Sequence, residues 1–219
     1  MRLPDRLAAG ALIACAVLVT GCLGAQQTTA VDPAGAGGLK PDREDKDVGL
    51  VGLAPGFDLK GYSILAIDRC AVNDPEVKDD EDRKLAAAMP EYYQAELVRR
   101  ARETGLFTRV VHLGEASAPA PAPGLLRLEC VITRLAPGSR ALRYLVGFGA
   151  GRSKAQTEVR FVDVQSGRVV MLVADRRAAA YGVFGGDSEE HLKESFGDMA
   201  RDLGKFLVRL HRGEAPKKD

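Results

Sequence analysis

Four cysteines are the side chains of this 219-residue chain that are best suited to covalent chemistry. Cys15 lies inside an apolar run, residues 7–19, and Cys22 comes shortly after that run, behind two small residues. Cys70 and Cys130 lie far downstream. A thiolate attacks electrophiles and forms disulfides, whereas a buried thiol behaves as a small apolar side chain. The position of each cysteine therefore decides which role we expect of it.

The residues ahead of Cys22 have the pattern of a secretory signal peptide. Arg2 and Arg6 make a basic start, and the apolar run over residues 7–19 follows it. A helix needs about 20 residues to span a bilayer, so this run is too short and has instead the length of a signal-peptide core. We therefore expect this segment to direct export.

The run Leu18–Cys22 resembles the bacterial lipobox, in which a branched apolar residue and two small residues precede an acylated cysteine. Val19 stands where leucine is commoner. The resemblance implies that residues 1–21 are a lipoprotein signal peptide, and that the Cys22 thiolate attacks a lipid donor and becomes the new N-terminus. Two other interpretations remain: a secretory signal cut near Ala25, which would discard Cys22, and an uncut signal anchor.

The same resemblance implies where the protein lies. Lipoproteins of this kind carry a diacylglyceryl group and usually a third, amide-linked chain, and two or more chains anchor a protein stably. Leu23 follows the cysteine, at a position where an aspartate favours inner-membrane retention in Gram-negative bacteria. We therefore expect a lipid-anchored, periplasm-facing protein of the outer membrane if the source is Gram-negative.

Charge and composition exclude several other classes of protein. Lysine and arginine number 31 and aspartate and glutamate number 30, so the formal net charge is +1. A nucleic-acid-binding protein usually has a clear basic excess, so we expect no nucleic acid as a partner. Hydrophobic residues make up 46% of the chain, which excludes disorder throughout. One folded domain behind a tether fits this length.

The boundaries of that domain follow from the local composition. We predict that residues 22–58 form the lipidated N-terminus and a flexible tether, because a glycine-rich stretch and the charged run Asp42–Asp47 interrupt any apolar period. The folded domain is predicted over residues 59–212, and residues 213–219 are predicted to be a disordered tail. A proline-rich stretch, residues 118–124, is predicted to be an extended surface loop.

The apolar periodicity inside the domain predicts two helices and about five strands. Period-two alternation indicates strands, and apolar spacings of three and four indicate helices. The predicted strands cover residues 62–67, 107–113, 126–133, 155–164 and 168–178, and the predicted helices cover residues 83–104 and about 190–212. The fold class is therefore α+β, a two-layer domain with a mostly antiparallel sheet packed against two helices. The first strand, first helix and second strand are expected to form a parallel unit.

The glycine-rich segment Gly147–Arg152 does not fit a nucleotide site. The third glycine of the dinucleotide pattern G-x-G-x-x-G falls on Arg152, and a predicted strand follows instead of a helix. The Gly-Lys-Ser/Thr of a P-loop is also absent from the sequence. We therefore expect no nucleotide.

The residues around this segment resemble a known family. The run Arg143–Gly151, followed by a strand and then by Val162–Gly167, resembles bacterial lipoproteins of the uncharacterised-domain family numbered 4410. The resemblance brings no activity with it. The glycine and apolar pattern of the segment itself makes a candidate interaction segment of Arg143, Gly147, Phe148, Gly149 and Gly151.

Two interpretations of this interaction segment remain open. If it is extended, its glycines share one face and would allow another backbone to approach closely. The segment then either completes the core or forms an exposed apolar loop that docks a partner or enters a membrane.

The remaining two cysteines are candidates for a disulfide. Cys15 leaves with the signal peptide and Cys22 is acylated, so Cys70 and Cys130 remain in an oxidising compartment. Two buried free thiols are the alternative.

No catalytic constellation stands out in the sequence. The three histidines lack neighbours at metal-ligand spacing, and no serine-hydrolase or metalloprotease motif occurs. We expect no metal, no cofactor and no enzyme activity, but a membrane-anchored protein that binds an envelope protein during export, assembly or maintenance. The alternative is an enzyme or ligand-binding lipoprotein acting on a cell-wall or lipid component, which a deep pocket with convergent polar groups would favour.

Overall fold

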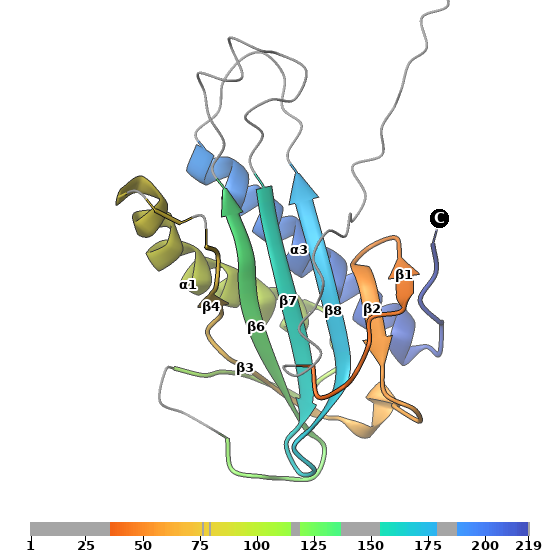
Figure 1. The fold of residues 1–219 in the computed structure, drawn as a ribbon. Coiled ribbons are helices and arrows are strands. Elements are labelled where there is room, and N and C mark those ends of the chain that lie inside the picture. Colours follow the sequence, from red (N-terminus) through yellow and green to blue (C-terminus); the bar gives the residue numbers. More distant parts are fainter. Residues whose placement is uncertain are drawn as a thin grey trace, which may run out of the picture.

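Within the described part of the chain, eight strands form one sheet in the order β1-β2-β8-β7-β6-β3-β5, with β4 paired to β6 (Figure 1). The structure is a computed structural model that describes residues 36–75, 77–78, 80–114, 119–136, 154–178 and 188–218. The strands are β1 (Arg43–Asp45), β2 (Gly49–Leu53), β3 (Ile64–Ile67), β4 (Ala71–Val72), β5 (Arg109–His112), β6 (Leu125–Ala136), β7 (Lys154–Asp163) and β8 (Arg168–Ala178). The helices are α1 (Asp80–Glu103), α3 (Ser188–His211) and a short 3-10 helix (Leu59–Gly61).

The α+β class is confirmed, but the predicted count of about five strands is wrong. Strands β1, β2 and β4 are additional to those predicted. β1 has three residues and β4 has two, which is too short for an alternating pattern to show. β2 reads Gly-Leu-Val-Gly-Leu, and glycine is depleted in strands.

The sheet has a parallel part and an antiparallel part. β5 and β6 both pair parallel to β3, so β3, α1 and β5 form the expected parallel unit. β6, β7 and β8 pair antiparallel in a long meander, and β2 and β1 extend it in the same way. At the β7–β8 turn the Ser166 N–H donates to the Asp163 carboxylate at 2.7 Å, and Gly167 has φ +68°.

The two helices cover one face of the sheet, which lies behind the strands in Figure 1. The apolar stripe of α1 is buried there, with Tyr93 and Leu97 at its centre. On α3, Phe196 and Phe206 are fully buried, and the Phe196 ring lies 5.1 Å from that of Tyr93. The helix-covered face therefore holds the main hydrophobic core.

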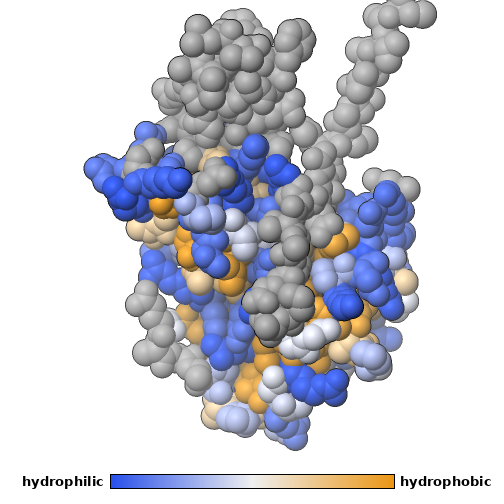
Figure 2. Space-filling view, viewed as in Figure 1, coloured by the Kyte–Doolittle hydropathy of each residue, from blue (hydrophilic) through white to orange (hydrophobic). Residues whose placement is uncertain are grey.

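The opposite face, called the open face below, carries charged side chains along its central strands. Because side chains alternate along a strand, Arg127 of β6 and Glu158 and Arg160 of β7 point away from the helices. Arg127 donates to the Asp68 carboxylate at 2.8 Å, and Arg160 and Glu158 are 3.7 Å apart. Hydrophobic surface on this face comes in separate patches between hydrophilic areas (Figure 2).

Residues 36–42, called the N-terminal strap below, lie against the open face over β2 and β8. Ala36 is fully buried, and a Cβ built on Gly37 would lie 3.5 Å from Val169 at the start of β8. The Lys40 carbonyl comes so close to Gly52 of β2 that a Cβ there would lie 2.6 Å from it. The strap therefore packs directly on the backbone of β2.

The predicted tether, residues 22–58, extends too far into the chain. The N-terminal strap packs on the sheet, and β1 and β2 are strands of it. The charged run that indicated a solvated tether is held by long-range ion pairs. Asp45 is buried and accepts hydrogen bonds from Arg209 of α3 at 2.7 and 2.9 Å. Arg209 also pairs with Asp47 at 2.7 Å. These partners lie more than 160 residues away in sequence, so local composition does not reveal them.

The predicted disordered tail, residues 213–219, is likewise corrected as far as residue 218. The Lys217 N–H donates to the Asp45 carboxylate at 3.1 Å, and the Lys46 N–H donates to the Lys217 carbonyl at 2.9 Å. The end of the chain therefore lies along β1 and covers that edge of the sheet, which protects it from pairing with other chains.

Candidate binding groove

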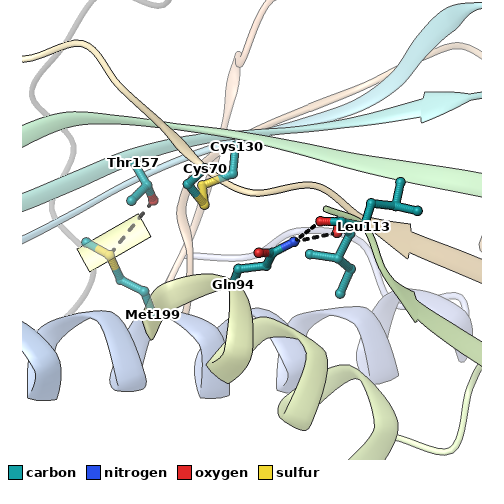
Figure 3. Close-up of a disulfide and its surroundings, with 7 residues drawn as sticks. Cys70, Gln94, Leu113, Cys130, Thr157 and Met199 are labelled. Carbon is teal, nitrogen blue, oxygen red and sulfur yellow. Dashed lines mark hydrogen bonds between the residues drawn. A yellow bond between two sulfur atoms is a disulfide. The ribbon is translucent and has the colours of Figure 1, made fainter. Parts of the chain in front are cut away.

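The structure joins the two cysteines that the sequence analysis paired. Cys70 follows β3 and Cys130 lies in β6, and a disulfide connects them with Cα atoms 4.5 Å apart (Figure 3). Both side chains are buried in the main core. The bond therefore ties the β3–β4 connection to the longest strand of the sheet.

Gln94 of α1 lies near this disulfide and reaches the ends of two parallel strands (Figure 3). Its side-chain amide donates to the carbonyls of Ile67 in β3 and Leu113 after β5, both at 2.9 Å. Because Gln94 is buried, leaving its side-chain amide without acceptors would be costly. The glutamine therefore fixes where β3 and β5 end relative to α1.

On the open face the same two strands form one wall of an apolar groove of about 420 Å³, called the β3–β5 groove below. Four aliphatic side chains on or next to β3 and β5 line this wall, and Leu125 at the start of β6 adds a fifth; the four are Ile64, Ala66, Val111 and Leu113. Residues 119–122, Pro-Ala-Pro-Ala, line the groove from the proline-rich loop. That loop therefore lies over a second, smaller apolar cluster on the open face, and the groove is the space that remains between the loop and this cluster.

The β3–β5 groove contains one charged side chain. Arg109 of β5 lines it and is exposed. The charged neighbours on β6 and at the end of β3, Arg127 and Asp68, pair with each other. Among the described residues, the lining of the groove is therefore aliphatic apart from this one cation.

A buried cluster of charged side chains lies elsewhere, between β8 and α3. The carboxylate of Asp175 pairs with the Arg177 guanidinium at 2.9 Å, and Arg177 also lies 3.3 Å from Asp202. Burial raises the pKa of Asp175 to about 6, despite the favourable charge of Arg177. These groups join strand to helix, and within the described part of the chain no cluster of histidine, cysteine or carboxylate side chains could hold a metal ion.

The other predicted site residues lie outside the described part of the chain. These are Cys22 and the interaction segment with Arg143, Gly147, Phe148, Gly149 and Gly151. In the described ranges no helix is both long enough and apolar enough to cross a membrane.

The comparison with protein families now identifies the chain. The model of the Domain of unknown function (DUF4410) matches residues 54–183, which is more than half of the sequence. The chain belongs to the DUF4410 family. The match contains β3 to β8 and therefore the whole β3–β5 groove. No curated protein matches this DUF4410 chain in sequence.

Solved structures similar to this DUF4410 protein come from several bacteria. A PelC dodecamer from Paraburkholderia phytofirmans has 12% identity and a TM-score of 0.45, covering 70% of this chain and 94% of that chain. The DUF330 protein XCC0632 from Xanthomonas campestris has 9% identity and a TM-score of 0.44, covering 74% and 92%. A candidate lipoprotein from Caulobacter crescentus has 15% identity and a TM-score of 0.35, covering 73% and 96%. At these identities the likeness concerns the fold alone.

The sequence analysis of this DUF4410 chain missed the β3–β5 groove, although one signal for it was present. β3 reads Ile-Leu-Ala-Ile, four consecutive apolar residues, which is typical of a strand buried on both faces. Leu65 and Ile67 belong to the main core, whereas Ile64 and Ala66 belong to the smaller cluster on the open face. The two-sided burial of β3 therefore pointed to an apolar area beyond the helix-covered core.

Proposed function

We propose that this DUF4410 protein is a lipid-anchored lipoprotein of the bacterial cell envelope that binds a partner and performs no catalysis. The observation that carries the proposal is the lipobox-like run Leu18–Cys22 close ahead of a folded domain. The disulfide between Cys70 and Cys130 supports it, because such bonds persist in oxidising compartments such as the periplasm. Leu23 supports an outer-membrane position in a Gram-negative cell.

The chemistry of the domain supports binding over catalysis. The buried carboxylates of Asp45 and Asp175 pair with Arg209 and Arg177, so their charges are used within the fold. The β3–β5 groove offers aliphatic surface and one exposed cation. Such a surface recognises a ligand by its shape and charge, and it favours, as a second function, the binding of a lipid component of the envelope.

The anchorage is tested by replacing the acylated residue. Cells that express the wild-type protein or Cys22→Ser are fed an alkyne-bearing fatty acid, and the purified protein is examined for the label. We expect label in the wild type, complete loss of label in Cys22→Ser, and accumulation of the unprocessed precursor. Cys15→Ser serves as the matched control and should stay fully labelled. Label that persists in Cys22→Ser would refute the anchor.

The partner is tested at the predicted interaction segment. A photo-crosslinking amino acid replaces Phe148, and the matched control carries it at Arg83, which is exposed on α1. After irradiation of intact cells, we expect a discrete crosslinked protein from position 148 that is absent from position 83. Equal, diffuse crosslinking from both positions would count against a docking role for this segment.

A further inference from the structure

The lining of the β3–β5 groove suits a chain of methylene groups better than it suits a peptide. All lining side chains except Arg109 are aliphatic or proline, and Pro119 and Pro121 lack a backbone N–H. An extended peptide carries an N–H and a C=O at most residues, and each of these is unfavourable to bury without a partner. An acyl chain has no polar group along its length, so burying it against this lining leaves no hydrogen-bonding group of the ligand without a partner.

We propose that the β3–β5 groove binds one acyl chain of an anionic membrane lipid, with Arg109 holding the head group. The inference rests on the proposed function, because membrane anchorage keeps the groove near lipid. The volume of about 420 Å³ lies within the range of ligand pockets, roughly 300–1,000 Å³. A methylene group is similar in size to a water molecule, which takes about 30 Å³, so roughly a dozen carbons of a single chain would fill the groove.

Arg109 supplies the charge complementarity for the head group. The fork of N–H donors on an arginine guanidinium matches a carboxylate or a phosphate. Among the described residues no carboxylate is paired with it, whereas Arg127 on the nearby strand β6 is bound to Asp68. The acyl groups predicted on Cys22 carry no charge, so Arg109 favours a separate anionic lipid over the protein's own anchor.

The geometry keeps a membrane within reach of the groove. The N-terminal strap and the groove lie on the same open face, and three strand spacings, about 15 Å, separate β8 from β3. Thirteen residues, 23–35, connect Cys22 to the strap, and at about 3.3–3.6 Å each they reach at most about 45 Å. The open face can therefore meet the leaflet that holds the anchor.

The experiment uses the full-length lipoprotein reconstituted in phosphatidylcholine vesicles. The probe is a phosphatidylglycerol with a diazirine on one acyl chain, and labelled peptides are mapped by mass spectrometry after irradiation. We expect label on the peptides that contain residues 109–113 and 119–125. A phosphatidylcholine probe with the same chains should label them at least fivefold less. A groove without label, or with label no stronger than that on α1, overturns the proposal and leaves an extended peptide as its ligand.

Two substitutions with matched controls separate chain binding from head-group binding. Ala122→Phe fills the groove from the loop, which is only half-buried there, and should lower the label at least tenfold, whereas Ala87→Phe on the exposed side of α1 should not. Arg109→Gln should remove the preference for phosphatidylglycerol, and Arg83→Gln should keep it. Thermal melting of each variant checks that the fold is intact. Normal labelling in Ala122→Phe, or an unchanged preference in Arg109→Gln, overturns the proposal.

This test and the test of the anchor fail independently. The probe is added from outside, so acylation at Cys22 does not incorporate it. An acylated Cys22 with an unlabelled groove would end the lipid-binding proposal and leave the anchorage standing. A labelled groove in a protein whose Cys22 is not acylated would end the anchorage proposal and leave the lipid-binding proposal standing.

Discussion

Adjacent residues of β7 show how differently the two faces of this sheet are built. Val159 and Phe161 face the helices and are buried in the main core, whereas Glu158 and Arg160 face the other way and form an ion pair. On the helix-covered face, long amphipathic helices exclude water from a continuous apolar surface. On the open face, charges occupy the central strands, and short irregular segments cover the apolar areas that remain.

The two irregular segments of the open face also differ from each other. The N-terminal strap packs so closely that the Lys40 carbonyl meets the backbone of Gly52. The proline-rich residues 119–122 leave a groove of about 420 Å³ between themselves and β3 and β5. Close packing serves stability, whereas space lined by aliphatic side chains serves a ligand. The strap therefore stabilises one end of the open face, and the other end carries the groove for which we propose ligand binding.

The largest effect is expected on the helix-covered face. Phe161→Ala removes a fully buried ring and should lower the free energy of unfolding by about 3–5 kcal/mol, measured by chemical denaturation. Val162→Ala, one residue along on the open face and only partly buried, should cost about 1 kcal/mol or less. Equal losses of unfolding free energy in the two variants would contradict the proposed difference between the two faces of the sheet.

The disulfide should contribute almost as much to the helix-covered core. Replacing both Cys70 and Cys130 by alanine opens a 60-residue loop and should lower the free energy of unfolding by about 2–4 kcal/mol. Thiol labelling of the denatured protein checks the bond directly, because the two sulfurs should react only after reduction. Labelling without a reductant would restore the alternative of two free buried thiols.

The close packing of the strap makes a further prediction. Gly52→Ala would place a Cβ 2.6 Å from the Lys40 carbonyl, so the backbone of the strap or of β2 must shift. We expect a loss of about 1–3 kcal/mol, typical of overpacking, together with faster hydrogen exchange over residues 36–42. Unchanged exchange there would mean that the strap adds little to the fold.

Features that depend on local periodicity could be predicted from the sequence. Both long helices and five of the strands follow from apolar spacing, namely β3, β5, β6, β7 and β8. The parallel unit follows from the order of its elements. The cysteine pair was predicted from the expected compartment, because the lipobox-like run assigns the other two of the four cysteines to the predicted signal peptide and its acylation site. Each of these inferences uses residues that are close in sequence or few in number.

Features that depend on distant partners could not be predicted. The run Asp42–Asp47 has the composition of a solvated tether, but residues at the other end of the chain bring its carboxylates into the fold, among them Arg209 and Lys217. The groove needs the open sides of β3 and β5 together with a loop whose path no local pattern specifies. Both features are tertiary, so they became visible only with the fold.

The buried pair at β8 should make stability depend on pH. Burial raises the pKa of Asp175 to about 6, above the value of about 3.9 in an unfolded chain. The folded state therefore binds this proton more tightly, and the contribution of Asp175 to stability is present below about pH 4 and is lost as the pH rises through 6.

Asp175→Asn removes this titration. The stability of the variant relative to the wild type should rise by on the order of 2 kcal/mol between pH 4 and pH 7, because only the wild type is destabilised by ionisation. Denaturation curves at both values of pH measure the change. A constant difference between variant and wild type would show that Arg177 fully compensates the buried carboxylate.

The smallest effect is expected where the two helices meet on the helix-covered face. Gly204 lies inside α3 against α1, and a Cβ added there would lie 3.5 Å from Thr104 and 3.8 Å from Arg100, which are ordinary contacts. Alanine is favoured over glycine inside a helix, so Gly204→Ala should raise the free energy of unfolding by about 0.5–1 kcal/mol. Thermal melting measures the gain, with Gly52→Ala as the opposite case, in which backbone occupies the space. A loss of stability in Gly204→Ala would mean that the helices pack more closely than these distances indicate. Glycine would then be needed at the helix contact as well as at Gly52.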